Sequence, residues 1–77
     1  MSERQALATW VFMMLTAVRQ RLGMPVSEFT GFALKHGLIR FLFANHGLLR
    51  YYDNDYIVDD TLRFLEDQGV RLEVDAS

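Results

Sequence analysis

The chain has 77 residues, no cysteine and a formal net charge of −2, so it has neither a disulfide nor a thiolate metal site. A core this small seldom supplies more than about 3–5 kcal/mol of net stability, and yet 51% of the residues are hydrophobic. The length predicts a single domain over residues 1–77. The helical patterns described below place its core over about residues 5–70 and a tail over 71–77. The apolar surplus predicts a partner or self-association.

Charge is divided unevenly along the chain. Residues 1–52 carry six basic and two acidic side chains, a net of +4, whereas residues 53–77 carry two basic and eight acidic ones, a net of −6. Such a division bears on partners and solubility rather than on the fold. With a total of −2, we expect weak affinity for the phosphate backbone of a nucleic acid.

Residues 3–22 are predicted to form the first helix. One apolar stripe recurs at three- and four-residue steps and consists of Leu7, Val11, Met14, Val18 and Leu22. A second stripe beside it consists of Trp10, Met13 and Ala17. Together the stripes span more arc than one neighbouring helix can bury, which predicts a homodimer. The competing arrangement is a first helix that the other helices of the same chain enclose.

The apolar run from Ala6 to Val18 is a candidate for a signal peptide or a membrane span. It is shorter than the roughly 20 residues that a span requires. No clear cleavage site follows it, and Arg19 and Arg21 continue the helical pattern. We therefore expect a buried helix, no membrane contact and a cytoplasmic location, with which the lack of cysteine agrees.

Two short helices are predicted next. Gly23 and Pro25 interrupt the helical pattern, and Ser27 is expected to cap a second helix that Gly37 ends. Its predicted buried face consists of Val26, Phe29, Phe32 and Ala33. A third helix is predicted over residues 38–44, with Leu38, Phe41 and Leu42 inward. The turn-forming sequence Asn45-His46-Gly47 is expected to end it. The run 48–52 fits either a helical turn or an extended segment.

The last predicted helix is capped by Asp53, Asn54 or Asp55, runs to about Gln68 and ends at Gly69. Its inward positions are Ile57, Val58, Thr61, Leu62 and Leu65. The sequence Val70-Arg71-Leu72-Glu73-Val74 alternates as a strand does, so the tail is either an edge that pairs with something or irregular. The predicted fold class is all-α, a compact bundle of three to four helices with a short C-terminal extended tail.

No residue pattern predicts catalysis. The sequence contains no Gly-x-Ser-x-Gly elbow and no phosphate-binding glycine loop. His36 and His46 each lie beside a glycine that is expected to end a helix, where a histidine interacts favourably with the helix dipole. No further metal ligand lies at a spacing that would complete a metal site with either histidine. Asp53 and Asp55 are spaced as in a calcium-binding loop, but the glycine and glutamate that such a loop requires do not follow at the right positions. We predict a protein that is not an enzyme and has no catalytic residue, metal or cofactor.

Two groups of side chains are candidates for contact with a partner. The aromatic and methionine residues, of types enriched at the centres of interfaces, are Trp10, Met13, Met14, Tyr51, Tyr52 and Tyr56. The carboxylates are Asp55, Asp59 and Asp60. For each apolar residue taken singly, a place in the core is the commoner role. For the acids, helix capping and solvation near a helix N-terminus is the commoner role.

An alternative function is that of a small helical DNA-binding transcriptional regulator. It would use five basic residues, namely Arg19, Arg21, Lys35, Arg40 and Arg50. They are spread one per turn or fewer, and no predicted helix shows a basic recognition face. Nucleic acid is therefore not the expected partner.

Four sequence features also occur together in a known family. They are Glu28-Phe29, Lys35-His36-Gly37-Leu38-Ile39, Asp55-Tyr56-Ile57-Val58-Asp59-Asp60 and a helix that ends at Gly69-Val70. With them, the chain resembles the small bacterial proteins called domain of unknown function 3791 over about residues 7–70. The Tyr-Ile-Val-Asp-Asp segment is the most specific part of this likeness. Where the family often reads Leu-His-Thr, this chain has Leu49-Arg50-Tyr51, so no role of that histidine carries over.

The resemblance implies a bacterial protein whose gene lies beside one for an ADP-ribosyltransferase-like protein, an arrangement typical of a toxin–antitoxin pair. The predicted function is a non-enzymatic protein–protein interaction module of a bacterial cytoplasmic protein, namely an antitoxin-like or regulatory subunit. The expected partner is the ADP-ribosyltransferase-like neighbour or a second copy of the chain. Docking is expected to use the wide apolar face of the first helix and the acidic segment from Asp53 to Asp67.

Overall fold

The computed structural model describes residues 2–72, which form four helices. They are α1 (Glu3–Leu22), α2 (Val26–Lys35), α3 (Leu38–Leu49) and α4 (Asn54–Asp67). Within residues 2–72 there is no strand, so the predicted all-α bundle is confirmed. Residues 70–72 of the predicted strand are neither helix nor strand, and its last two positions, 73 and 74, lie outside the described residues.

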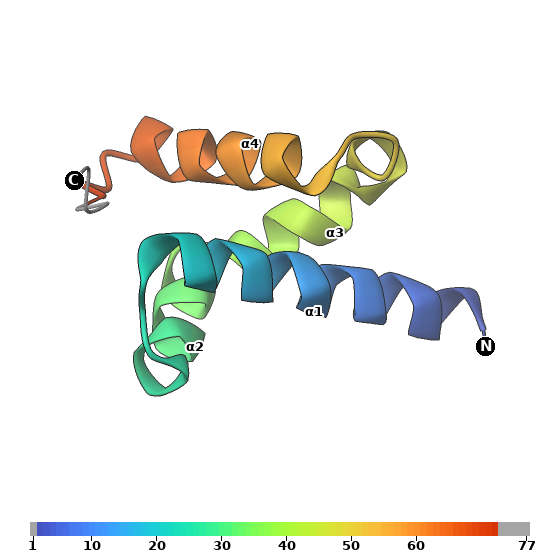
Figure 1. Cartoon of the computed structure of the whole chain (residues 1–77), viewed down its shortest axis with the longest axis horizontal. Helices are drawn as coiled ribbons and strands as arrows, with labels where there is room; N and C mark the ends of the chain where they lie inside the picture. The colour runs from blue at the N-terminus through green and yellow to red at the C-terminus, as the bar shows by residue number, and fades with distance from the viewer. Residues whose placement is uncertain (1, 73–77) are drawn as a thin grey trace.

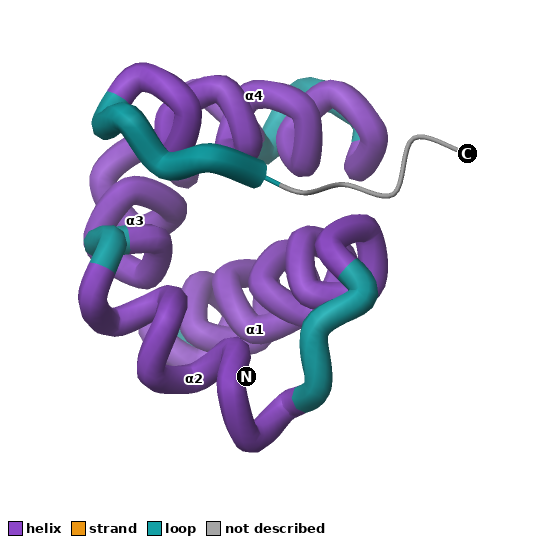
Figure 2. The backbone as a smooth tube through the Cα atoms, turned by 90° about the vertical axis from the view of Figure 1, so that its left-hand side faces the viewer, coloured by secondary structure: helices purple, strands orange, loops and turns teal. Residues whose placement is uncertain are grey.

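The two long helices, α1 and α4, run in the same direction along the molecule (Figure 1). α3 joins them along one side, and α2 lies beyond α1, on the side away from α4 (Figure 2). α1 packs mainly against α3 and α4, and α2 packs mainly against α3. One flank of α1 is therefore deeply covered, and the flank towards α2 is covered only in part.

α1 has the predicted bounds, with a cap at each end. The Ser2 hydroxyl accepts the N–H of Gln5 at 3.2 Å, and the Gln5 side chain accepts the N–H of Ser2 at 3.1 Å. This reciprocal capping box satisfies two backbone donors that the helix itself leaves free. At the other end Gly23 adopts φ 68°, a left-handed conformation that glycine takes without strain.

α2 differs from the prediction at its start. The helix begins at Val26, its N-cap is Pro25, and no side chain caps it, so the prediction of a Ser27 cap is wrong. The Pro25 carbonyl accepts the N–H groups of Glu28 and Phe29 at 3.1 and 3.0 Å, which begins the helix two residues earlier. Val26 is 63% exposed, so its predicted inward position is also wrong. α2 ends at Lys35, and the C-cap His36 separates it from the predicted stop at Gly37.

α3 is longer than predicted, because Asn45-His46-Gly47 does not end it. The side-chain amide of Asn45 donates to the carbonyl of Phe41 at 2.8 Å, within the helix. The His46 ring packs edge-on against Trp10 of α1, with ring centroids 4.7 Å apart. These contacts hold the segment in helical form, so the helix continues to Leu49 and includes the start of the ambiguous run 48–52.

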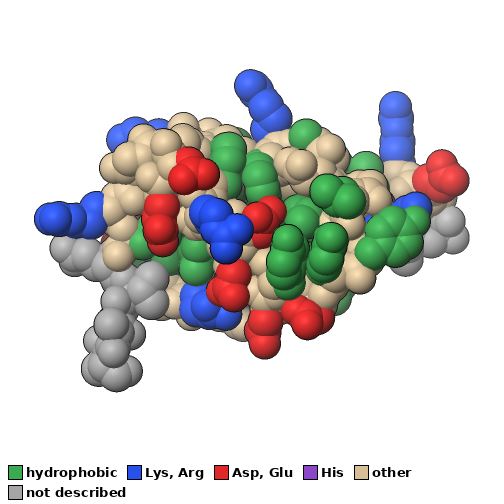
Figure 3. All heavy atoms as spheres, turned by 90° about the horizontal axis from the view of Figure 1, so that it is seen from above, with side chains coloured by type: hydrophobic (Ala, Val, Ile, Leu, Met, Phe, Trp, Pro, Cys, Tyr) green, Lys and Arg blue, Asp and Glu red, His purple; other side chains and the backbone are tan. Residues whose placement is uncertain are grey.

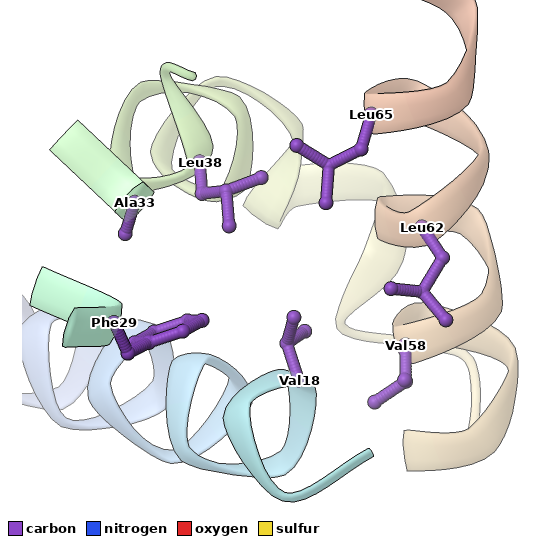
Figure 4. Packing of buried hydrophobic residues seen from close by; sticks show 7 residues of the cluster. All are labelled: Val18, Phe29, Ala33, Leu38, Val58, Leu62 and Leu65. Carbon is purple, nitrogen blue, oxygen red and sulfur yellow. The ribbon is translucent and has the colours of Figure 1, made fainter. Parts of the chain in front are cut away.

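The core consists of two clusters of buried side chains. One joins all four helices through Val18, Phe29, Ala33, Leu38, Val58, Leu62 and Leu65 (Figure 4). The other joins α1, α3 and α4 through Val11, Met14, Leu42, Leu49 and Ile57. All five predicted inward positions of α4 are confirmed as buried, including Thr61, whose hydroxyl donates to the carbonyl of Ile57 at 2.8 Å.

Candidate functional site

Several acids of the segment from Asp53 to Asp67 have structural partners. The Asp53 carboxylate caps α4 by accepting the N–H of Tyr56 at 2.8 Å. Asp59 accepts a hydrogen bond from Arg21 of α1 at 3.0 Å, which links the basic and acidic halves of the chain. Asp60 lies 3.8 Å from Arg63 one turn along α4. Among residues 2–72, Asp55 has no ion pair, and it is exposed.

Three tyrosines are exposed where α3 passes into α4. The rings of Tyr52 and Tyr56 stack with centroids 4.3 Å apart and planes at 18°, and the two residues are 44% and 45% exposed. Tyr51 is 74% exposed, and its hydroxyl accepts a hydrogen bond from the Arg50 guanidinium at 2.7 Å. We call Tyr51, Tyr52, Tyr56 and Asp55 the tyrosine patch.

The outer face of α4 has a mixed surface. Figure 3 shows carboxylates and cations interspersed over this face, with a group of hydrophobic side chains beside them. The acidic segment predicted from the sequence is therefore not a uniform negative surface. Asp59 and Asp60 are partly neutralised by Arg21 and Arg63, and the exposed Asp55 lies one residue from the Tyr56 ring.

The other candidate contact residues lie elsewhere. Met14 is 2% exposed, so it belongs to the core and the prediction of a partner contact is wrong for this residue. Trp10 is half-buried against His46 of α3. Met13 is 54% exposed on α1. The structure thus stacks Tyr52 on Tyr56, leaves Tyr51 and Asp55 exposed near them in the chain, and disperses the candidates from α1.

A second surface, which the sequence did not predict, lies between α1 and α2. It is a groove of about 390 Å³ whose walls include Phe12, Leu15, Arg19, Val26, Phe29 and Ile39. Phe12 is 69% exposed, and it belongs to neither apolar stripe of α1. The one feature of the sequence that could have indicated this groove is the absence of any charged residue from Gln5 to Val18.

The basic residues of the alternative function are distributed over different sites. Lys35 and Arg40 line a shallow hollow with His36 beside the C-terminal end of α4. The other three cations contact their own chain: Arg19 donates to the carbonyl of Met24 at 3.1 Å, Arg21 pairs with Asp59, and Arg50 contacts Tyr51.

The described part of the chain contains no group of three histidine, cysteine, aspartate or glutamate residues placed to hold a metal ion. Within residues 2–72, no helix combines the length and apolar character needed to cross a membrane. No protein-family model matches the chain, and no curated protein or solved structure shows significant similarity to it. The resemblance to domain of unknown function 3791 therefore stays a prediction.

Proposed function

We propose that the chain is a non-enzymatic protein–protein interaction module of a bacterial cytoplasmic protein, an antitoxin-like or regulatory subunit that docks its partner on the tyrosine patch. The observation that carries this proposal is the exposed stack of Tyr52 on Tyr56, with the exposed Asp55 at the preceding position of α4. The other candidate aromatic residue, Trp10, packs against His46 within the fold.

Stacked tyrosines are well suited to bind another protein. Each ring offers a large apolar area with few rotatable bonds, and its hydroxyl supplies a hydrogen bond at the rim. Because Tyr52 and Tyr56 already hold each other at 4.3 Å, a partner that covers them orders little further side-chain motion. Binding then loses less entropy than it would on separate, mobile side chains.

The charge beside the patch indicates the character of the partner. Asp55 is exposed and precedes Tyr56 in the sequence, Asp59 and Asp60 already face cations of the chain, and the Arg50 guanidinium lies over the Tyr51 ring. A partner with an apolar centre and a basic group placed near Asp55 therefore complements this surface. Exposed charges of this kind act mainly on the association rate, and salt screens them.

The first test is a binding measurement with the ADP-ribosyltransferase-like neighbour that the resemblance implies. Tyr56→Ala should weaken binding at least about tenfold, as truncation of an aromatic residue at an interface centre does. Asp55→Asn should lower the association rate at low salt and have little effect at high salt. The matched control is Leu34→Ala on α2, because Leu34 is 65% exposed but lies outside the patch.

Two outcomes would contradict the proposal. If the neighbour does not bind, or if Tyr56→Ala binds as tightly as the parent, the patch does not dock this partner. If the chain instead shifts DNA in a sequence-dependent manner at nanomolar concentration, the alternative of a transcriptional regulator replaces it.

A further inference from the structure

We propose that the face formed by α1 and α2 is a self-association surface, on which a second copy of the chain places its Phe12 in the α1–α2 groove and receives the first copy's Phe12 in return. This surface is separate from the tyrosine patch. The proposal starts from two side chains that stand out at the groove, Phe12 at 69% and Val26 at 63% exposure. Apolar residues gathered in this way on a soluble chain mark a binding site.

The face carries almost no charge. On α1 no charged residue occurs from Gln5 to Val18. On α2 Glu28 is two positions from both Val26 and Thr30, and residues at that spacing do not share a helix face. Of the side chains that line the groove, only Arg19 is charged, and its guanidinium donates to the carbonyl of Met24.

This neutrality decides which occupant fits. A partner with several charges at its docking site would bury most of them against apolar walls, where Arg19 alone among the lining residues offers a counter-ion, and this is unfavourable. A second copy brings the same nearly uncharged face, on which Arg19 is the one charged lining residue and already donates to the carbonyl of Met24. Depletion of charged residues, with aromatic and methionine side chains at the centre, is also the composition of homodimer interfaces.

The shape of the face is also self-complementary. A two-fold pair uses the same patch on both copies, so the patch must contain both a projecting group and a site that receives it. Phe12 is the projecting group, and the groove beside it has a volume of about 390 Å³. Sites that hold small molecules start at about 300 Å³, so the groove has room for an aromatic ring.

The test is sedimentation equilibrium of the full chain over about 1–100 µM, a range that brackets a modest dimer constant. The parent chain should approach twice its 9.0 kDa mass within this range. Phe12→Lys should raise the dimer dissociation constant at least about tenfold, because its ammonium group would lie between apolar walls and beside the cationic Arg19 of the other copy. Val26→Lys, on the opposite wall of the groove, should do the same.

The matched control is Leu48→Lys, which places the same charge on α3 at a residue that is 63% exposed and does not line the groove. It should associate as the parent does. Because Phe12 and Val26 contribute little buried area, their variants should keep the parent's helical circular dichroism and urea midpoint, so a loss of association reports on the surface and not on unfolding.

Three results would overturn the proposal. The first is a parent chain that remains at 9.0 kDa at 100 µM, and the second is a Phe12→Lys variant that associates as the parent does. The third is a monomeric parent whose docking of the neighbour is abolished by Phe12→Lys, which would assign the groove to that partner. Tyr56→Ala should leave self-association unchanged, so failure of the tyrosine patch and failure of this face are distinguishable.

Discussion

At the scale of single residues, Asp53 determines where α4 begins. Aspartate and asparagine are both good N-caps, so the sequence left Asp53, Asn54 and Asp55 as equal candidates. The choice depends on the extended backbone of Asp53, at φ −74° and ψ 166°, which directs its carboxylate to the N–H of Tyr56. This backbone angle follows from the path of the chain out of α3, which residue type alone does not specify.

Removal of this cap should destabilise the fold measurably. Asp53→Ala should lower the free energy of unfolding by about 0.5–2 kcal/mol, the range found for lost N-caps. Urea denaturation gives the value. Asp55→Ala is the control, because Asp55 makes no cap, and it should cost clearly less. Equal losses for the two variants would show that the charge near the helix N-terminus matters and the hydrogen bond does not.

Ile57, one residue after Tyr56, has a purely structural role. It is 1% exposed in the cluster that joins α4 to α1 and α3. Ile57→Ala should therefore lower the free energy of unfolding by about 2–5 kcal/mol, through lost burial and the cavity left behind. A shift of the thermal midpoint by only a few degrees would contradict this assignment. Leu48→Ala, at 63% exposure, should change stability little.

At the scale of helices, two glycines of similar appearance in the sequence have opposite roles. Gly31 lies within α2, and an added methyl group there would meet no atom within 4 Å. Gly37 lies between α2 and α3 at φ 71°, where an alanine would be strained. Gly31→Ala should raise the free energy of unfolding by about 0.5–1 kcal/mol, and Gly37→Ala should lower it by about 1–2 kcal/mol.

Chemical denaturation of both variants checks this pair, at a concentration where the chain is monomeric. Both substitutions add one methyl group in open space, so each serves as the other's control for side-chain size. If both stabilise the fold, the backbone at Gly37 relaxes without cost. If both lower the free energy of unfolding, the surroundings of Gly31 disfavour an added methyl group by more than the higher helix propensity of alanine contributes.

The helices differ in how well the sequence predicted them, and the contrast between their faces explains why. In α4 the buried residues alternate with charged ones at helical spacing, so Ile57, Val58 and the other inward positions could be assigned correctly. In α1 the central residues are all uncharged, so the stripes reveal the period but not which flank stays open. Phe12 was therefore overlooked, and Met14 was placed among contact residues.

Contacts between helices account for the errors in α2 and α3. His46 has a sequence neighbourhood typical of a turn, and it remains helical because its ring packs on Trp10, far away in the chain. Val26 has the apolar character of a buried residue, and it is exposed because α2 packs more on α3 than on α1. Neither fact is encoded in local periodicity, since each depends on how two helices are placed.

At the scale of the whole molecule, the candidate surfaces also depend on how the helices are placed, which local sequence periodicity does not specify. The tyrosines could be named from the sequence, but the stack of Tyr52 on Tyr56 depends on the path between α3 and α4. The groove exists only because α1 and α2 diverge while both pack on α3. The uneven division of charge was predictable, whereas the contact of Arg21 with Asp59 that joins its two halves was not.

The uncapped start of α2 has a consequence for how the native state fluctuates. α2 is held by two buried side chains, Phe29 and Ala33, and it contains Gly31 in its interior. We therefore expect local opening of this helix to cost less free energy than global unfolding, so hydrogen exchange should find its amides less protected than those of α1, α3 and α4. Each such opening would remove one wall of the groove, so the fraction of molecules with a formed groove should fall as α2 is destabilised.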